Sequence, residues 1–211
     1  MEVNWYLFGA GGLGREVCDT IIERKDFDGN LIFLDDSKTG LCLDLPIMHP
    51  EDIHSGGFFT ICIGEPKTRK LLFNRLIKKG LEPRSAISIH AIVSKSASVG
   101  AGCYISNGVQ INSGSRIKEN CIINPLAVIG HDVSIESSSV VSSHTSIGGG
   151  SLIGSEVFIG MGAQIKEKCA VGNRSIVGMG ASVFRSVESD LVVLGNPARV
   201  VSKTSSSGVF G

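Results

Sequence analysis

The chain has 211 residues, a length that suits one large domain or two small ones. Lysine plus arginine (20) balance aspartate plus glutamate (20), so there is no basic excess to neutralise a nucleic-acid backbone, and we expect no nucleic acid as a partner. The charge is unevenly placed: residues 1–90 hold 24 charged side chains, whereas residues 91–183 hold 11, together with 14 of the 27 glycines. This contrast predicts two architectures in one chain.

Targeting signals and cysteine chemistry are not expected. The first residues contain no basic segment ahead of an apolar stretch, which predicts a cytoplasmic protein without a secretory signal. The longest uncharged run, 96–115, is rich in Gly, Ser and Asn and does not suit a membrane span. The six cysteines lack C-x-x-C spacing and are expected to be small buried side chains: Cys18, Cys42, Cys62, Cys103, Cys121 and Cys169.

The first 85 residues follow a strand and helix pattern that is typical of nucleotide binding. An apolar run at 3–8 enters the sequence GAGGLG at 9–14, which opens a helix-like stretch, so the G-x-G-x-x-G motif has its usual strand-to-helix setting. A second strand at 31–34 ends in Asp35 and Asp36, at a spacing that suits carboxylates accepting from a ribose hydroxyl. A third strand at 60–63 ends at Gly64, and a helix is predicted over 66–79.

This pattern predicts a small Rossmann-like unit that binds a mononucleotide. It is half of the double unit that holds a dinucleotide, and no domain for hydride transfer follows, so a nicotinamide cofactor is not expected. The alternative, a tight glycine turn that binds nothing, stays open from the motif alone.

A six-residue repeat occupies the second half of the chain. Every sixth residue from Val93 to Val183 is valine or isoleucine, and the residue two places before each is small or β-branched. This period is that of the hexapeptide repeat of a parallel β-helix, and its fifteen steps predict about five coils of three units each. The aliphatic side chains should point into the prism, and a turn should begin at the glycine or asparagine that follows them.

His131 and Asp132 stand out within this repeat. They follow Ile129 by two and three residues, so the register places them at or outside a corner of the prism. An imidazole there can accept a proton as a general base, and a nearby carboxylate can fix its tautomer. On residue type alone, a solvated surface histidine remains the alternative.

The order of these motifs resembles the sialic acid O-acetyltransferase family and the related enzymes that N-acetylate UDP-linked 4-amino-sugars. The motifs are the short Rossmann-like unit, Ser88-Ile89-His90, Asn124, Gly130-His131-Asp132 and the turn 195–199. The resemblance implies a left-handed β-helix at 87–201 after a nucleotide-sugar-binding domain at 1–86, and a homotrimer with acetyl-CoA in the cleft between subunits. The Ser/Gly-rich tail, 202–211, is expected to be disordered.

The resemblance also assigns site residues. It implies that His131 is the catalytic base, with Asp132 beside it. It implies that the acceptor is held by Gly11, Gly12, Leu13, Asp35, Asp36, Gly64 and Asn124. The acetyl-CoA site is expected to involve Val140, His144, Gly149, Gly160, Met161, Gly178, Met179 and Arg199. Related enzymes often have histidine where this chain has Leu13 and Val140, which leaves the sugar specificity open.

We therefore expect an acetyltransferase that moves acetyl from acetyl-CoA to a nucleotide-linked amino sugar or a sialic acid in bacterial surface glycan synthesis. The acceptor should attack the thioester directly, because the cysteines of the β-helix fall in the inward register and cannot act as nucleophiles. The glycine run 148–150 is a candidate oxyanion region. No metal is expected, since the histidines lack the close pairing of a zinc site. O-acetylation of a free sugar and an inactive nucleotide-sugar-binding scaffold are the alternatives.

Overall fold

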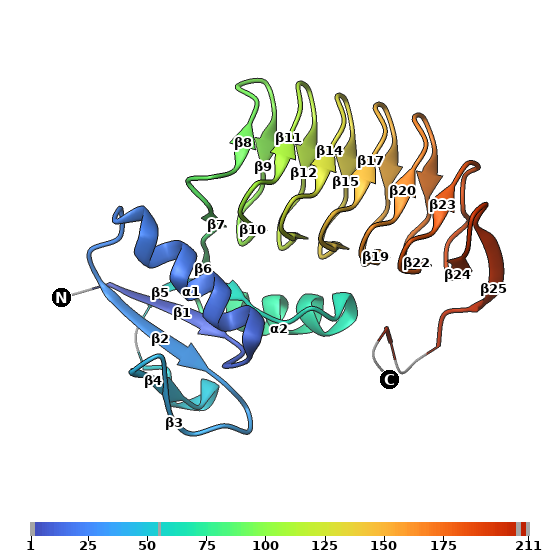
Figure 1. Ribbon diagram of the computed structural model, residues 1–211. Coiled ribbons are helices and arrows are strands. Elements are labelled where there is room, and N and C mark those ends of the chain that lie inside the picture. Colours follow the sequence, from blue (N-terminus) through green and yellow to red (C-terminus); the bar gives the residue numbers. More distant parts are fainter. Residues whose placement is uncertain (1–2, 55, 206–207, 210–211) are drawn as a thin grey trace.

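A computed structural model describes residues 3–54, 56–205 and 208–209, which form an α/β unit and a parallel β-helix (Figure 1). The N-terminal unit contains β1 (Asn4–Phe8), α1 (Gly12–Arg24), β2 (Asn30–Leu34), β3 (Gly40–Cys42), β4 (Leu45–Met48), a 3-10 turn η1 (Pro50–Asp52), β5 (Gly57–Ile61), α2 (Pro66–Lys78) and β6 (Glu82–Pro83). Its sheet has the order β3-β4-β2-β1-β5-β6, and only β3 is antiparallel.

This arrangement confirms the Rossmann-like unit. Strand β1 lies between β2 and β5 and is almost wholly apolar, as expected for a parallel strand covered on both faces. The hairpin β3–β4 and the short β6 were not predicted, because their sequences lack the alternation or the continuous apolar run of an ordinary strand.

The β-helix has three faces of short parallel strands. The first face contains β7 (Ala86–Ile87), β10 (Tyr104–Ile105), β13 (Ile122–Ile123), β16 (Val140–Val141), β19 (Phe158–Ile159), β22 (Ile176–Val177), β24 (Leu191–Leu194) and β25 (Arg199–Lys203). The second contains β8 (Ile92–Val93), β11 (Gln110–Ile111), β14 (Val128–Ile129), β17 (Ser146–Ile147), β20 (Gln164–Ile165) and β23 (Ser182–Val183). The third contains β9 (Ser98–Val99), β12 (Arg116–Ile117), β15 (Ser134–Ile135), β18 (Leu152–Ile153) and β21 (Ala170–Val171).

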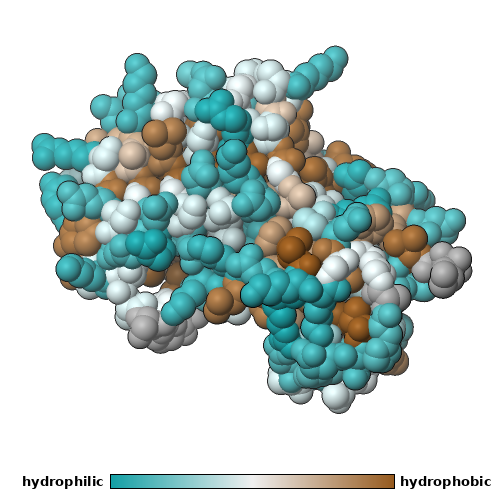
Figure 2. Space-filling model, turned by 180° about the vertical axis from the view of Figure 1, so that it is seen from behind, coloured by the Kyte–Doolittle hydropathy of each residue, from teal (hydrophilic) through white to brown (hydrophobic). Residues whose placement is uncertain are grey.

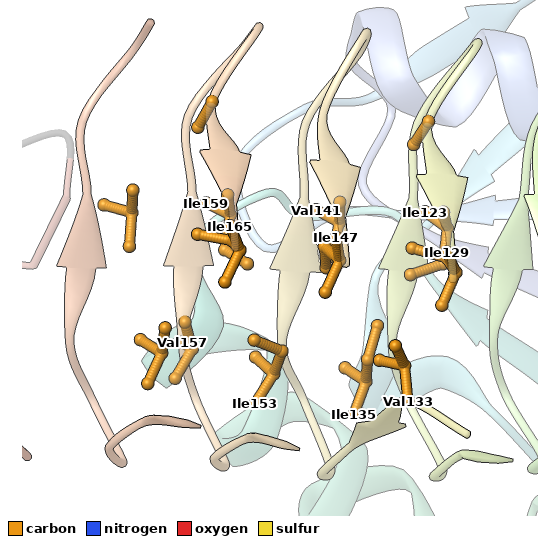
Figure 3. Close-up of a cluster of buried hydrophobic side chains, with 14 of the residues drawn as sticks. Ile123, Ile129, Val133, Ile135, Val141, Ile147, Ile153, Val157, Ile159 and Ile165 are labelled. Carbon is orange, nitrogen blue, oxygen red and sulfur yellow. The ribbon is translucent and has the colours of Figure 1, made fainter. Parts of the chain in front are cut away.

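The inward register of the repeat is confirmed. From Ile105 to Val183 the aliphatic residues of the repeat are buried and stack in one continuous core (Figure 3). The estimate of about five coils is slightly low, because β7 already occupies the repeat positions before Val93. At the other end, Val187 and Val193 extend the stack beyond Val183.

The turns differ from the expectation in one respect. The residue with left-handed backbone conformation comes three places after the aliphatic residue, as at Asp132 (φ 58°), rather than one place after it. The glycine directly after the aliphatic residue has another role: a Cβ on Gly130 would lie 2.7 Å from the amide nitrogen of Gly149 in the next coil. Glycine is therefore needed there for the close approach of two coils.

The two units share a hydrophobic core. The outward side chains of the first face include Tyr104, Ile122 and Val140, and all three are buried against residues of β1 and α1, such as Trp5 and Val17. The second face instead presents polar outward side chains at Gln110, Ser146 and Gln164. Because apolar surface gains by leaving water, the first face is the one that the N-terminal unit covers.

Arg69 of α2 fixes the same junction through hydrogen bonds. Its side chain is fully buried and donates to the carbonyl and side-chain oxygens of Asn120, at 2.8 to 3.1 Å, in a turn of the β-helix. It also donates to the carbonyl of Ile61, the last residue of β5, at 2.6 Å and to that of Ile63 at 2.9 Å. Burial lowers the pKa of this guanidinium to about 10.

The C-terminal segment corrects part of the expected disordered tail. Strand β25 pairs with β24 and continues to Lys203, and the amide of Thr204 donates to the carbonyl of Asp190. The amide of Val209 donates to the Glu65 carboxylate of the N-terminal unit at 2.7 Å. Residues 206–207 and 210–211 of that tail lie outside the described residues.

Hydrophilic side chains project from both units on the face shown in Figure 2, with hydrophobic side chains lying between them. Within the described ranges, neither α1 nor α2 is long and apolar enough to cross a membrane.

Candidate active site

The turns of the β-helix form edges on which the candidate residues lie. The turns from the first face to the second, here called the 1–2 edge, contain Asn107, Pro125–Leu126, Ser143–His144, Met161–Gly162 and Met179–Gly180. The turns from the second face to the third, the 2–3 edge, contain Ser113–Gly114, His131–Asp132, Gly149–Gly150 and Glu167–Lys168. Residues 18 apart lie in adjacent coils of one edge.

His131 and Asp132 are paired on the 2–3 edge. The imidazole Nδ1 lies 2.9 Å from Oδ2 of Asp132, and the two side chains are 72% and 70% exposed. Their backbone is tied on both sides: the Asp132 amide donates to the carbonyl of Ser113, and the Gly150 amide donates to the carbonyl of His131. A proton on Nδ1 donates to the carboxylate and leaves the Nε2 lone pair free to accept another proton.

Gly149 lies directly against this imidazole. A Cβ built on Gly149 would meet Nε2, Cε1 and Cδ2 of His131 at 2.5 to 2.9 Å. The backbone of the candidate oxyanion region therefore adjoins the nitrogen that would act as the base.

The candidate acceptor residues of the N-terminal unit gather at the carboxyl edge of its sheet. The parallel strands β2, β1 and β5 end beside one another, and each leads into an expected site segment: Asp35, the glycine turn and Gly64. A Cβ on Gly11 or Gly12 would meet nothing within 4 Å, so the start of α1 is open to a ligand. In the part of the chain that the structure describes, no side chain caps this helix start through a hydrogen bond.

Asp35 holds the loops of this edge together. Its Oδ2 accepts from the amide of Ala10 at 3.1 Å, and its Oδ1 accepts from Ser37 and from the amide of Lys38. Partial burial would raise the pKa of the Asp35 carboxyl, but these hydrogen bonds outweigh burial and hold the pKa below its usual value. The Asp35 carboxylate, which was expected to bind a ribose, thus already accepts hydrogen bonds from other residues of the protein.

Asp36 is the exposed member of the acidic pair. It forms an ion pair with Arg75 of α2, at 2.9 Å, and Arg75 also contacts Glu51 at 2.7 Å. Lys79 contacts the same glutamate at 2.8 Å, and the hydrogen bonds from Lys79 and Arg75 lower the pKa of Glu51 to about 2. Asp36 can still reach a ligand, because its side chain is half exposed.

Val140 does not lie at an accessible site, which corrects its expected role beside acetyl-CoA. Its side chain is 2% exposed and belongs to the core between the two units. Leu13 packs against the same cluster from the first turn of α1. The two positions at which this chain departs from related enzymes are therefore apolar and face one hydrophobic region.

Asn124 follows β13 at the 1–2 edge and is half-buried. Its neighbour Pro125 lines a cavity of about 430 Å³ between this edge and α1, together with Glu16, Asp19, Glu23, Tyr104 and Asn107. Asn124 is the one expected acceptor residue outside the N-terminal unit, and the fold places it beside that unit.

The remaining residues of the expected acetyl-CoA site are divided between edges. His144, Met161 and Met179 lie on the 1–2 edge and are exposed, whereas Gly149 lies with His131 on the 2–3 edge. Gly160 and Gly178 allow close packing: a Cβ on Gly160 would lie 2.6 Å from the Met179 amide nitrogen, and one on Gly178 would overlap Leu194. Arg199 is exposed on β25, far along the chain from the His131 turn.

The cysteines are unsuited to nucleophilic catalysis. Five of the six are buried and Cys42 is half-buried, with all six free. Burial raises the pKa of the Cys62 thiol to about 12 and that of Cys18 to about 11. Among the described residues there is no cluster of three or more His, Cys, Asp or Glu side chains that could hold a metal ion.

Sequence reasoning missed Arg69 and the ion-paired Arg75. Arg69 precedes Leu72, Phe73 and Leu76 by three, four and seven residues, which is the spacing of one helix face. An arginine on the apolar face of a predicted helix was therefore the signal of a buried polar contact. Arg75 gave no comparable signal, because its partners come from residues 36 and 51.

A hexapeptide β-helix that follows a Rossmann-like unit is an architecture that this chain shares with solved acetyltransferases. Residues 4–76 match the family model of the PglD N-terminal domain.

Solved structures are similar over almost the whole chain. A variant of perosamine N-acetyltransferase from Caulobacter crescentus, in complex with CoA and GDP-perosamine, is 25% identical over 95% of this chain and 97% of its own, with a TM-score of 0.87. The acetyltransferase domain of PglB from Neisseria gonorrhoeae, in complex with acetyl coenzyme A, is 25% identical over 95% of this chain and 100% of its own, with a TM-score of 0.90. WeeI from Acinetobacter baumannii is 26% identical over 94% of this chain and 100% of its own, with a TM-score of 0.89. The chain is thus similar, in both of its units, to acetyltransferases of known structure.

Proposed function

We propose that this protein transfers acetyl from acetyl-CoA to the amino group of a nucleotide-linked amino sugar. The observation that carries the proposal is the exposed His131–Asp132 pair, with Nε2 of the histidine against the backbone of Gly149. This pair lies in a chain whose two-unit architecture matches that of an enzyme solved with CoA and GDP-perosamine.

The chemistry needs one base and one site for developing negative charge. The neutral amine of the acceptor attacks the thioester carbonyl carbon, and a C–N bond forms while Nε2 of His131 takes the proton from nitrogen. The carbonyl oxygen becomes an oxyanion, and we assign its stabilisation to the amide of Gly149, whose backbone adjoins Nε2 of His131. The C–S bond then breaks, the carbonyl re-forms, and coenzyme A leaves as a thiolate.

Asp132 supports this role without touching the acceptor. Its carboxylate accepts from Nδ1–H, which selects the tautomer with a free Nε2 and stabilises the imidazolium that forms. The open start of α1 and Gly64 form the proposed site for the nucleotide part of the acceptor. Asp36 provides an exposed carboxylate at this site, and Asp35 holds the glycine turn to the loop after β2 by its hydrogen bonds.

Acetylation of a sugar hydroxyl is the second candidate, because it needs the same base and the same oxyanion site. The experiment is thiol release from acetyl-CoA across UDP-, dTDP- and GDP-linked amino sugars, sialic acids and free amino sugars. Mass spectrometry identifies the product, and mild alkali separates the two reactions, since it hydrolyses an ester and spares an amide.

His131→Ala is the decisive variant for this assay. We expect turnover to fall about 10²- to 10⁴-fold, the usual effect of losing a general base. Its melting temperature should match the wild type, because the side chain is 72% exposed and supports no core contact. Turnover within threefold of the wild type would remove His131 from the mechanism, and His54→Ala, at an exposed histidine of the N-terminal unit, is the histidine control.

A further inference from the structure

The His131–Asp132 pair lies between two glycines of the neighbouring coils. Gly149 follows His131 by 18 residues and Gly114 precedes Asp132 by 18, so both are on the 2–3 edge, one coil on either side. The nearest atoms to a Cβ on Gly149 are three ring atoms of His131. The nearest atom to a Cβ on Gly114 is Oδ1 of Asp132, well inside 3.0 Å.

The backbone does not explain the glycine at position 149. Its φ is outside the left-handed range, and the same turn position in other coils holds side chains as large as Glu119, Pro125 and Met161. The neighbours that a side chain would meet at this position belong to the His131 ring. The absence of a Cβ at position 149 therefore leaves room for the imidazole of His131.

Two features favour glycine at position 114: the backbone conformation and the nearby carboxylate of Asp132. The Gly114 φ of 72° favours glycine, but the equivalent left-handed position holds Asn120 and Leu126 in the next two turns of the β-helix, so side chains are tolerated there. At Gly114 a side chain would also displace the carboxylate of Asp132.

Resting on the proposed role of His131, we propose that Gly149 and Gly114 are positioning residues that together set the orientation of the catalytic pair. Both imidazole and carboxylate are exposed side-chain ends, so a Cβ beneath either of them would move the side chain and leave the coil intact. The backbone of the pair is already fixed by Ser113 and Gly150, so these glycines act on the side-chain torsions that remain free.

The first test is Gly114→Ala, with Gly162→Ala as its matched control. Both glycines occupy the left-handed position of a turn, with φ of 72° and 67°, but a Cβ on Gly162 meets nothing within 4 Å. The melting temperatures of the two variants should fall by the same amount relative to the wild type. Only Gly114→Ala should lose kcat, by about 10- to 100-fold, as expected for a misplaced catalytic group. KM for both substrates should stay within about threefold.

The second test asks whether Gly114 acts through Asp132. In an Asp132→Ala background, Gly114→Ala should cause no further loss of kcat, because the group it displaces is gone. A loss that adds in full to that of Asp132→Ala would overturn the proposal for Gly114. So would equal kcat values for Gly114→Ala and Gly162→Ala.

The third test does not depend on turnover. Nitrogen-15 NMR of the full chain should show one tautomer of His131 in the wild type and in Gly162→Ala, with the proton on Nδ1, and a changed spectrum in Gly114→Ala and Gly149→Ala. Unchanged His131 signals in both of the last two variants would overturn the proposal even if His131→Ala is inactive. Conversely, an active His131→Ala enzyme would contradict the proposed function, whereas the NMR result on the orientation of the His131 ring would still stand.

Discussion

At the scale of single residues, Arg69 is a fully buried charged side chain that joins the two units. Arg69 donates to the carbonyls of Ile61, Ile63 and Asn120 and forms no ion pair with a carboxylate among the described residues, so these hydrogen bonds offset the cost of burying the guanidinium. Removing the guanidinium would leave these oxygens buried without their donor, which is more costly than losing an exposed hydrogen bond.

Arg69→Met keeps the apolar stem and removes the donors. We expect it to lower the free energy of unfolding by about 2 to 5 kcal/mol in chemical denaturation. Arg75→Ala, on the same helix, is the control: its ion pairs are exposed, so its loss of stability should be much smaller than that of Arg69→Met. Equal stability of Arg69→Met and the wild type would show that the junction does not depend on this side chain.

At the scale of elements, the carboxyl edge of the N-terminal sheet depends on the charge of Asp35. Its carboxylate joins the glycine turn after β1 to the loop after β2, and these contacts hold its pKa below the unfolded value. A lowered folded pKa means that the stabilisation is complete above the unfolded pKa and is lost as pH falls through the folded one.

Asp35→Asn should therefore melt at a lower temperature than the wild type at pH 7, and this difference should shrink as the pH falls below about 4. Thermal unfolding followed across that range measures the effect. Asp36→Asn, at the neighbouring exposed carboxylate, should show a smaller difference at pH 7, because the contacts of Asp36 with Arg75 and His49 lie at the surface. A constant gap for Asp35→Asn at all pH values would contradict the role of its charge.

At the scale of the whole molecule, one prism cannot surround acetyl-CoA. His131 and Gly149 lie on the 2–3 edge, and the exposed Met161 and Met179 lie on the 1–2 edge. The second face separates these edges, with small or polar outward residues such as Ser146 and Gln164 lining a shallow cavity of about 310 Å³. A cleft between two prisms can bring different edges of different chains to one ligand.

We therefore expect a trimer in sedimentation, with each site built from two chains. His131→Ala chains and Met161→Asp/Met179→Asp chains, inactive alone, should recover activity when refolded together. Random assembly at equal amounts gives about one intact site in four. A monomer under assay conditions, or no recovery from a mixture that does form trimers, would contradict the shared site.

The sequence by itself determined the two-unit architecture, the register of the β-helix core and the exposure of the His–Asp pair. These features depend on local periodicity: a side chain at every sixth position must point inward whichever coil it belongs to, so Ile129 fixes where His131 lies. A further periodic signal was present, since Tyr104, Ile122 and Val140 recur every 18 residues and mark the face that the N-terminal unit covers.

Only the tertiary structure decided what each side chain contacts. It showed that the Asp35 carboxylate joins two loops of the protein, and it buried Val140 between the two units. It also buried Arg69 against a turn 51 residues away. These outcomes depend on pairs that are distant in sequence, and their energies come from burial and hydrogen bonds that exist only once both partners are in place.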